Sequence, residues 1–420
     1  MDIEIVTIGT ELLLGYTLDS NGAEIARSLG EHGVRVVRRT SVGDQSEEIR
    51  EAVRGALERT GAVLTTGGLG PTRDDVSKRA VAELFGVSLR FDDAVWEALV
   101  SRFAKLGRVP VASNRVQAEV PEGATVLPNR WGTAPGLWLD SARMSGREGV
   151  RGLVIMLPGV PHEMRNLLRH EVIPRLVESG SGTVVRSLTV RTTGIPESTL
   201  AERLGEIESD IAPLTLAYLP GEDGVDLRVT AWALPPANAE QRLRVAAELL
   251  QARGGEHVYG EGDTDLAALV LESARARSFH IAVAESCTGG LLAKRLTDTP
   301  GSSDVFRGGV VAYDNALKTS LLDVPLELIK RHGAVSEEVA RAMALGAARR
   351  LDADLTAAVT GIAGPGGGTP DKPVGTVWFA TALQGDVATL RSVIPGSRSE
   401  MRARAAQAGL YLLIRRLRSA

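Results

Sequence analysis

A hydroxyl and a thiol stand side by side between Ile281 and Leu291, where an apolar run breaks into a glycine pair. Ser286, Cys287 and Thr288 follow a strand-like segment, and helical spacing resumes after the glycines. A tight turn there would place these side chains beside backbone N–H groups that lack intrahelical partners. The Ser286 hydroxyl could attack a carbonyl, and the N–H groups could hold the resulting oxyanion. Capping of the helix by Ser286 or Thr288 is an equal alternative.

Cys287 is a rival nucleophile at the same turn. Thiolates are intrinsically better nucleophiles than alcohols, and a helix N-terminus lowers the pKa of a thiol. Small buried cysteines are also common core residues. Both Ser286 and Cys287 are therefore candidates for covalent chemistry.

A second loop with chemical potential follows residue 65. Glycines there allow close backbone approach to a phosphate, and a helix expected to open at Pro71 would add N–H donors. Two adjacent carboxylates would repel a phosphate unless a cation such as Mg2+ bridges them, although acids are also favoured at a helix N-terminus. The residues concerned are Gly67, Gly68, Gly70, Thr72, Asp74 and Asp75.

Alternating strand and helix patterns position this loop in a first domain, residues 1–177. The alternation predicts an α/β fold, a doubly wound and mostly parallel sheet with helices on both faces. Ligands of such folds sit at the carboxyl ends of the strands. The expected strands are 3–8, 34–37 and 62–65, and the expected helices are 21–30 and 47–59.

Residues 181–260 predict a small α+β module. Gly221 to Gly224 should turn two strands into a hairpin. Glu222 and Asp223 in this turn would repel a phosphodiester, so we expect a spacer or dimerisation unit and not a nucleic-acid clamp.

The serine turn belongs to a third segment, residues 263–420, which reads as a second α/β domain. Strands are expected at 281–284, 309–313 and 355–360, with Tyr313 and Lys318 beyond the second and a glycine-rich loop, Gly361 to Gly368, beyond the third. The final helix, expected at 401–417, is predicted to cover the core without chemistry of its own.

Composition bounds the function classes. The chain has 420 residues, 44% hydrophobic residues and a net charge of −4, which favours a globular protein and does not favour nucleic acid. A single cysteine excludes an intrachain disulfide and fits a reducing compartment. With no basic leader and no long apolar run, we expect a cytoplasmic protein without membrane contact.

The stretch from Thr66 to Asp75 resembles the signature of MoaB/MogA-like, molybdopterin-binding-type domains. It is more similar to the version that opens CinA (competence/damage-inducible) proteins. Segments 9–15, 129–136 and 157–164 match that family too. Ser77 stands where a threonine is usual. In this family a KH-like module holds the position of residues 181–260.

The resemblance implies a divalent-metal-dependent pyrophosphatase acting on ADP-ribose. Asp44 and Asp75 match the functional aspartates, and Asp74 with Asp75 would hold Mg2+ or Co2+. Substrate contacts would come from Glu11, Asn21, Gly67, Gly68, Gly70 and Thr72. His162 could be a metal ligand, but a structural role is favoured because Pro161 and Glu163 fit the first turn of a helix.

Residues 263–420 resemble the nicotinamide mononucleotide deamidase domain found alone in PncC-type proteins and at the end of CinA. The match implies attack by Ser286, a Lys318 base whose pKa is lowered by burial near cations, proton relay by Tyr313, and oxyanion or carboxamide binding by Thr360. Arg398 would hold the nucleotide phosphate. The turn and loop contacts would be Thr288, Gly289, Gly290, Gly361 and Gly364. No cofactor is expected for this domain.

These matches predict a homodimeric enzyme of pyridine nucleotide (NAD) salvage. Two alternatives remain at this point. The first domain could be a non-catalytic nucleotide- or pterin-binding sensor, or the protein could be a competence or recombination partner.

Overall fold

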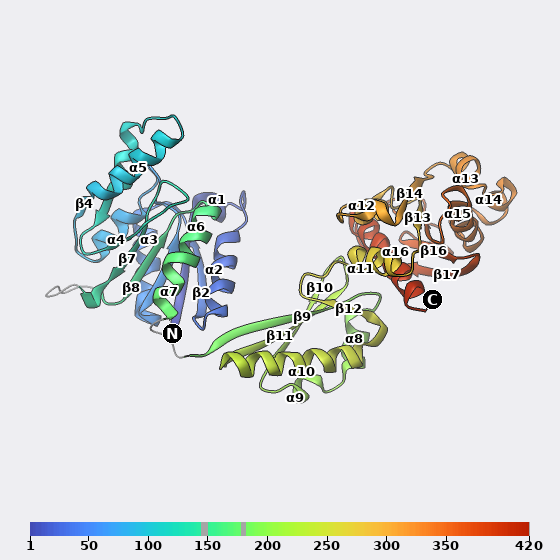
Figure 1. The fold of residues 1–420 in the computed structure, drawn as a ribbon, viewed down its shortest axis with the longest axis horizontal. Helices are drawn as coiled ribbons and strands as arrows, with labels where there is room; N and C mark the ends of the chain where they lie inside the picture. The colour runs from blue at the N-terminus through green and yellow to red at the C-terminus, as the bar shows by residue number, and fades with distance from the viewer. Residues whose placement is uncertain (144–149, 178–181, 420) are drawn as a thin grey trace. The chain divides into compact units, whose positions relative to one another are not determined.

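The computed structural model describes residues 1–143, 150–177 and 182–419. The chain divides into two compact units, Met1–Arg186 with Ala231–Gln241, and Ser187–Thr230 with Arg242–Ala420. Figure 1 labels many of the elements of both units. The division passes through the middle module, because β9 (Val184–Thr192), β11 (Val225–Leu234) and α10 (Pro236–Gly254) belong partly to each unit.

The first domain contains a six-stranded sheet in the order β2-β1-β3-β8-β7-β6. The first four strands of this order are parallel, and β7 and β6 are antiparallel additions. The fold class expected from the sequence, a mostly parallel α/β sheet, is confirmed. The strands are β1 (Asp2–Ile8), β2 (Arg35–Val42), β3 (Ala62–Thr66), β6 (Thr125–Leu127), β7 (Gly136–Asp140) and β8 (Leu153–Leu157).

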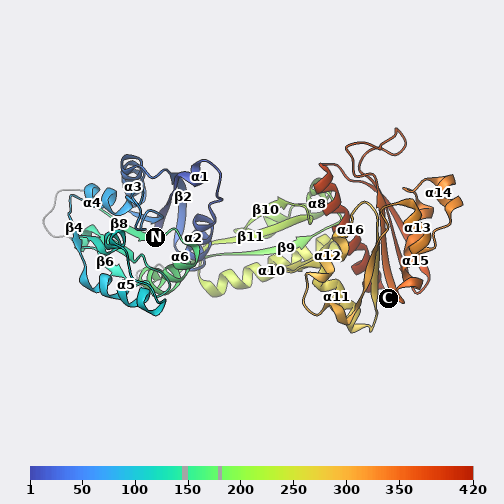
Figure 2. The same ribbon diagram turned by 90° about the horizontal axis from the view of Figure 1, so that it is seen from above.

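Alternating side chains of the central strands pack into two separate cores, because successive strand residues point to opposite faces of the sheet. Ile3 and Ile5 pack with α2 (Ser20–Glu31), whereas Val6 and Ile8 pack with α3 (Ser46–Thr60). Figure 2 shows the same elements from a second direction. Further helices are α1 (Thr10–Leu13), α4 (Ser77–Leu84), α5 (Asp93–Lys105), α6 (Pro161–Leu167) and α7 (Ile173–Val177).

The prediction that a helix begins at Pro71 is wrong. Residues 67–76 form bends and turns, and α4 begins only at Ser77. The Asp75 carboxylate accepts hydrogen bonds from the backbone N–H and the hydroxyl of Thr72, so this segment closes on itself as a loop.

The middle module is a four-stranded sheet in the order β10-β11-β9-β12. The hairpin at Gly221 to Gly224 is confirmed, since the Gly221 N–H donates to the Gly224 carbonyl (2.8 Å) between paired β10 and β11. Strand β12 was not expected. The remaining elements are α8 (Glu197–Leu204), α9 (Ile207–Asp210), β10 (Thr215–Pro220) and β12 (Val258–Glu261).

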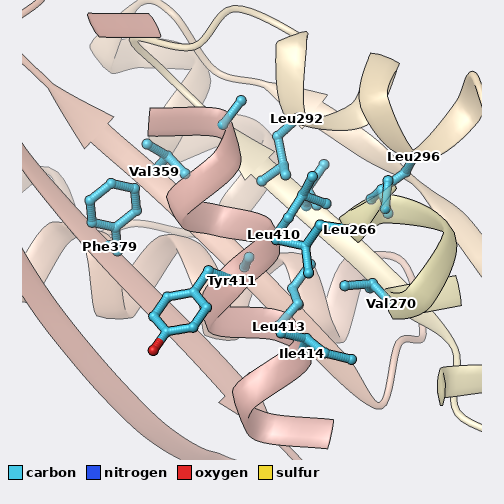
Figure 3. Close-up of a cluster of buried hydrophobic side chains, with 14 of the residues drawn as sticks. Leu266, Val270, Leu292, Leu296, Val359, Phe379, Leu410, Tyr411, Leu413 and Ile414 are labelled. Atoms are coloured by element: carbon cyan, nitrogen blue, oxygen red, sulfur yellow. The ribbon is translucent and has the colours of Figure 1, made fainter. Parts of the chain in front are cut away.

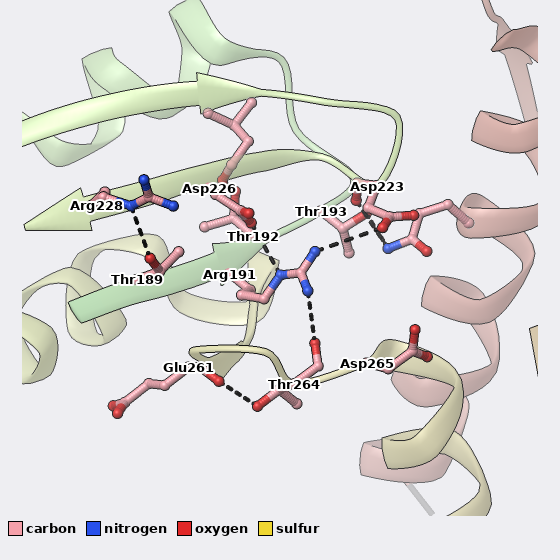
Figure 4. A network of polar contacts seen from close by, with 12 residues as sticks. Thr189, Arg191, Thr192, Thr193, Asp223, Asp226, Arg228, Glu261, Thr264 and Asp265 are labelled. Atoms are coloured by element: carbon pink, nitrogen blue, oxygen red, sulfur yellow. Dashed lines mark hydrogen bonds and ion pairs between the residues drawn. The ribbon is translucent and has the colours of Figure 1, made fainter. Parts of the chain in front are cut away.

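The acidic hairpin turn binds the last domain. The Asp223 carboxylate pairs with Arg295 (2.9 Å), and its carbonyl accepts from the buried Gln407 side chain (2.9 Å). Figure 4 shows Arg191 between Asp223 and Asp226, with a further hydrogen bond to the Thr264 carbonyl (3.1 Å). Arg295 lies on α12 (Leu291–Thr297) and Gln407 on α16 (Arg398–Ser419), so the turn contacts two helices of the last domain.

The last domain holds a five-stranded sheet in the order β14-β13-β15-β16-β17. The first three strands of this order are parallel, and β16 and β17 are antiparallel. The expected second strand, 309–313, is observed at 306–311, so Tyr313 lies two residues beyond it. The strands are β13 (Ile281–Glu285), β14 (Phe306–Val311), β15 (Leu355–Gly361), β16 (Thr376–Leu383) and β17 (Asp386–Val393).

Helices cover both faces of this sheet. On one face, Leu410 and Leu413 of α16 pack with Leu266, Val270 and Leu292, which Figure 3 shows as one apolar cluster. The other face packs against α13, α14 and α15. The helices are α11 (Leu266–Ala276), α12 (Leu291–Thr297), α13 (Asn315–Leu322), α14 (Leu326–His332), α15 (Glu337–Arg350) and α16 (Arg398–Ser419).

Within the described ranges, none of the helices has the length and apolarity required to cross a lipid bilayer.

Candidate functional site

Ser286 is the first residue after β13, at the carboxyl edge of the last domain's sheet. Its N–H donates to the Val359 carbonyl of neighbouring β15 (2.9 Å), and its carbonyl accepts from Gly289 (3.1 Å). The side chain is 8% exposed. The turn is therefore fixed to the sheet, and it holds Ser286 largely out of water.

The N-terminus of α12 is occupied by a side chain that the sequence prediction missed. The fully buried Glu285 carboxylate accepts from the N–H groups of Gly290 (3.0 Å), Leu292 (3.1 Å) and Ala293 (2.8 Å). The expectation that the helix N-terminus supplies free oxyanion donors is therefore wrong. Gly289 and Gly290 shape the turn, but their N–H groups are already engaged.

Two other N–H groups of the turn remain available. Those of Cys287 and Thr288 make no hydrogen bond to a carbonyl or side-chain oxygen in the described part of the chain. Both lie beside the Cys287 sulfur and stabilise negative charge there. The Thr288 hydroxyl is buried and has no partner among the described residues. A buried polar atom of this kind favours a ligand or water that completes its hydrogen bonding.

The outer side of the turn is bound by Arg402, another residue that the sequence prediction missed. Its guanidinium donates to the carbonyls of Cys287 (3.2 Å) and Thr288 (2.8 Å). The final helix therefore does more than cover the core. Its spacing of four residues from Arg398, on the same face of the helix, was a signal that could have indicated Arg402.

Cys287 is part of the apolar core. It is 4% exposed, and a Cβ added at Gly361 would lie 3.1 Å from its sulfur, so the thiol packs closely against β15. Burial raises the pKa of Cys287 to about 12. A thiol with such a pKa is almost entirely protonated at neutral pH, which argues against Cys287 as the nucleophile.

Lys318 lies in α13 and is 1% exposed. Its ammonium donates to the Tyr313 carbonyl (3.3 Å) and the Asn315 side-chain oxygen (3.4 Å). Burial lowers the pKa of Lys318, and the negative charge of Asp314 opposes that shift. The direction agrees with the expectation, but the cause is desolvation and not a neighbouring cation.

The Tyr313 side chain is 57% exposed, and its hydroxyl accepts from Arg398 (2.6 Å). Arg398 also donates to the Gly364 carbonyl in the glycine-rich loop (2.7 Å). Lys318 contacts the backbone of Tyr313 and not its hydroxyl. The geometry therefore joins Tyr313 to Arg398, and it does not support proton relay from Tyr313 to Lys318.

Thr360 is buried at the end of β15, where its hydroxyl donates to the Ala334 carbonyl (2.9 Å). Its proton is thus engaged, and it can offer a ligand only an acceptor oxygen. The Thr376 hydroxyl is also buried, with no partner among the described residues. Gly361 lies between these strand ends, since a Cβ there would approach the Thr376 carbonyl to 2.8 Å.

In the first domain, the glycines of the loop after β3 pack closely against other atoms of the protein. A Cβ at Gly67 would lie 2.2 Å from the Ile8 carbonyl, at Gly68 2.0 Å from the Ser77 hydroxyl, and at Gly70 2.5 Å from the Asp75 carboxylate. Backbone conformation and packing therefore require glycine at positions 67 and 68, where φ is 113° and 66°, whether or not a phosphate binds. At Gly70 the neighbouring atoms belong to the Asp75 side chain, which can move.

The acidic residues at this edge have defined partners. Asp44 Oδ2 accepts from the Thr10 N–H (2.8 Å), and Asp75 Oδ2 accepts from the Thr72 N–H (2.8 Å). A hydrogen bond from Thr72, together with its own backbone N–H, lowers the pKa of Asp74. In these bonds Asp44 and Asp75 each use a single carboxylate oxygen.

No cluster of three or more His, Cys, Asp or Glu side chains that could hold a metal occurs in the residues described. Mg2+ usually takes only one or two carboxylates, with substrate phosphates and water as its other ligands. The Oδ1 atoms of Asp44 and Asp75 and the exposed Asp74 fit that limited role. They do not form a protein-only metal cage.

Asn21 points its amide nitrogen at the Gly159 carbonyl (2.8 Å) and the Thr66 hydroxyl (3.3 Å). Its Oδ1 is buried with no partner in the described part of the chain, so it can accept from a ligand. Glu11 folds over Gly9, where an added Cβ would meet its carboxylate at 2.4 Å.

Two further side chains lie near this edge. Lys78, which the sequence prediction missed, is 3% exposed and donates to the Val116 carbonyl (2.5 Å). Burial lowers the pKa of Lys78 to about 8, against the opposing charges of Glu119 and Asp75. Glu163 in the first turn of α6 accepts from the Asn129 side chain (2.6 Å), which supports its structural role.

The fold and the residues at the carboxyl edges of the two sheets define the class of protein. It is an α/β protein with a MoaB-like first domain, a KH-like module and a second α/β domain with a serine turn. Three family profiles agree. "Probable molybdopterin binding domain" matches residues 4–178, "Damage-inducible protein CinA KH domain" matches residues 187–260, and "CinA C-terminal domain" matches residues 263–417.

Relatives match along almost the whole chain. A CinA-like protein of Gemmatimonas aurantiaca is 53% identical over 418 residues, covering 99% of this chain and 96% of the relative. One of Chlorobaculum tepidum is 40% identical over 421 residues, covering 99% and 98%. The chain belongs to the CinA-like protein family. Among solved structures, the competence/damage inducible protein CihA from Agrobacterium tumefaciens is 41% identical over 36% of this chain and 92% of that chain, with a TM-score of 0.35.

Proposed function

We propose that the last domain hydrolyses the carboxamide of nicotinamide mononucleotide to nicotinic acid mononucleotide and ammonia. One observation carries this proposal. The amine of Lys318 is buried at the same sheet edge as Ser286, and its hydrogen-bond partners in the described chain are neutral oxygens. Such an amine loses its proton more readily than an exposed lysine, as a general base requires.

In the proposed reaction, neutral Lys318 takes the proton of Ser286 as the serine oxygen bonds to the carboxamide carbon. The tetrahedral intermediate then expels ammonia, which receives that proton from Lys318, and an acyl-Ser286 ester remains. Water attacks the ester with Lys318 again as base. The carboxylate leaves, and Ser286 regains its proton.

The N–H groups of Cys287 and Thr288 are the donors that we assign to the oxyanion, because those of Gly289 and Gly290 are already engaged. Thr360 can accept from the carboxamide N–H2, because its own proton is engaged. Arg398 keeps donors beyond those bound by Tyr313 and Gly364, and these suit the nucleotide phosphate.

Ammonia release from nicotinamide mononucleotide by the full chain tests this proposal. We expect Ser286→Ala to abolish release and Cys287→Ala to retain most of it, because the buried thiol is protonated. Release that survives Ser286→Ala, or that disappears only with Cys287→Ala, would contradict the assignment of the nucleophile.

We also propose that the first domain cleaves ADP-ribose to AMP and ribose 5-phosphate with a divalent metal. The buried, unpartnered Asn21 Oδ1 and the carboxylate oxygens left over at Asp44 and Asp75 support a polar ligand at this edge. When bound, Mg2+ or Co2+ would neutralise phosphate charge. Gly67, Gly68, Gly70, Thr72 and Glu11 would shape the loops around the ligand.

AMP release from ADP-ribose in Mg2+ or Co2+ tests the second activity. We expect Asp75→Asn to abolish AMP release. Binding of ADP-ribose without AMP release would instead support the sensor alternative. Together the two activities would recycle products of NAD breakdown. Homodimerisation and cytoplasmic location remain predictions.

A further inference from the structure

Arg402 binds the nucleophile turn from the side of α16. Its Nε and Nη2 donate to two successive carbonyls, those of Cys287 and Thr288. These residues stand 115 and 114 positions apart in sequence from Arg402, so only the folded domain brings them together. The core shared by α12 and α16, which includes Leu292 and Leu410, fixes the helix from which Arg402 reaches the turn.

The hydrogen bonds from Arg402 to these carbonyls determine the direction in which the Thr288 N–H points. The peptide between Cys287 and Thr288 is not among the cis bonds of the described chain, so its C=O and N–H point in opposite directions. Because Arg402 holds the Cys287 carbonyl, the Thr288 N–H must point away from the guanidinium. That side carries the Cys287 sulfur, on which the same N–H acts.

The contact also strengthens the donor. A hydrogen bond from a charged group to a peptide carbonyl polarises that peptide, and the polarised N–H becomes a better donor. Glu285 meanwhile occupies the N–H groups of Gly290, Leu292 and Ala293. The turn is thus held between a carboxylate and a guanidinium, and in the described part of the chain the N–H groups of Cys287 and Thr288 have no oxygen partner and lie beside only the Cys287 sulfur.

We infer that Arg402 is a positioning residue of the amide hydrolysis: it orients and polarises the Thr288 peptide so that its N–H stabilises the oxyanion. This inference rests on the proposed deamidase function. Arg402 contacts no substrate in this scheme, whereas Arg398, one turn earlier on α16, binds the phosphate. Loss of Arg402 should therefore slow the chemical step and leave substrate binding nearly intact.

The test is steady-state kinetics of ammonia release by the full chain with Arg402→Ala, Arg402→Lys and a matched control. Arg404→Ala is the control, because Arg404 lies on the same helix and donates to the Pro395 carbonyl (3.2 Å), away from the turn. Removal of a direct oxyanion donor lowers kcat about 100-fold or more, so we expect a fall of roughly tenfold or more in kcat for Arg402→Ala. KM should change by less than about threefold, as for loss of an interaction made in the transition state.

Added guanidinium at millimolar concentration should restore part of the kcat of Arg402→Ala and leave Arg404→Ala unchanged. Arg402→Lys should retain an intermediate kcat, since one ammonium can bind one carbonyl well but matches two poorly. Equal kcat in Arg402→Ala and the parent would overturn the inference. A fall in kcat that parallels a fall in thermal stability in all three variants, and that guanidinium does not reverse, would show that Arg402 has a merely structural role. An inactive parent chain would instead refute the deamidase itself.

Discussion

Lys318 is the residue whose protonation should govern deamidase activity. Burial lowers its pKa below the usual 10.5, so the neutral amine is more abundant near pH 8 than for an exposed lysine. We expect kcat/KM to rise with pH through a midpoint below 10.5. Lys318→Met should abolish ammonia release. A pH–rate profile of the parent chain and of the Lys318→Met variant measures both effects. Lys330→Met, at an exposed lysine paired with Glu327, should leave the profile unchanged.

The same shift predicts the pH dependence of stability. Between the folded pKa of Lys318 and 10.5, the unfolded chain binds more protons than the folded chain, so the free energy of unfolding should rise with pH. The stabilisation is complete above 10.5 and is lost as pH falls through the folded pKa. Urea unfolding across this range should show a smaller slope for Lys318→Met, and an unchanged slope would contradict a lowered pKa.

At the residue scale, the sequence placed Ser286 correctly because an apolar run that breaks into glycines marks a strand end locally. Glu285 and Arg402 were missed because their roles depend on tertiary closure. Nothing near Arg402 in the sequence indicates that its partners are the carbonyls of residues 287 and 288. The Tyr313 hydroxyl was assigned to Lys318 for a similar reason, since its true partner, Arg398, is 85 positions away.

At the element scale, the turn from Gly221 to Gly224 should stabilise two helices of the last domain. These are α12, which follows the Ser286 turn, and α16, which carries Arg402. Asp223→Asn keeps the carbonyl that Gln407 binds but removes the charge that pairs with Arg295. Both side chains of that pair are partly exposed, so we expect a loss of no more than about 1 kcal/mol in urea unfolding. Glu222→Gln, one residue away, is the matched control and should have no effect.

A double-mutant cycle separates this contact from a general charge effect. Asp223→Asn and Arg295→Met should together cost less than the sum of the single variants, because both remove the same ion pair. Additive losses would show that the turn and α12 are energetically independent.

Element boundaries followed local patterns well and failed where loop contacts intervene. Strands β1, β3, β13 and β15 were predicted because buried β runs are continuous, whereas the parallel strand β8 (Leu153–Leu157) was missed. The helix at Pro71 failed because side-chain bonds between Thr72 and Asp75 stabilise a loop instead. Strand β12 was missed because it has only four residues, one of them Gly260.

At the scale of the whole molecule, each compact unit has its own sheet with cores on both faces, so the two proposed activities should be separable. In the full chain, we expect Ser286→Ala to lose ammonia release but to keep AMP release from ADP-ribose. Asp75→Asn should show the converse. Parallel assays of both products measure this, and loss of both activities in either variant would contradict independent sites.

The three-part organisation was visible in the sequence, since each segment has its own alternation of strands and helices. The division into two compact units was not. Contacts between distant residues, among them those of Asp223 with Arg295 and Gln407, join much of the middle module to the last domain.

The attachment of Asp223 to Arg295 also has an evolutionary consequence. A KH-like turn with basic residues could face a phosphodiester, but here the same position holds a carboxylate bound to the protein's own arginine. A lineage that acquired a basic residue at 223 would place like charges together, and selection would then favour replacement of Arg295 as well. Positions 223 and 295 should therefore covary in charge among relatives, and RNA binding at this turn is expected only where both have changed.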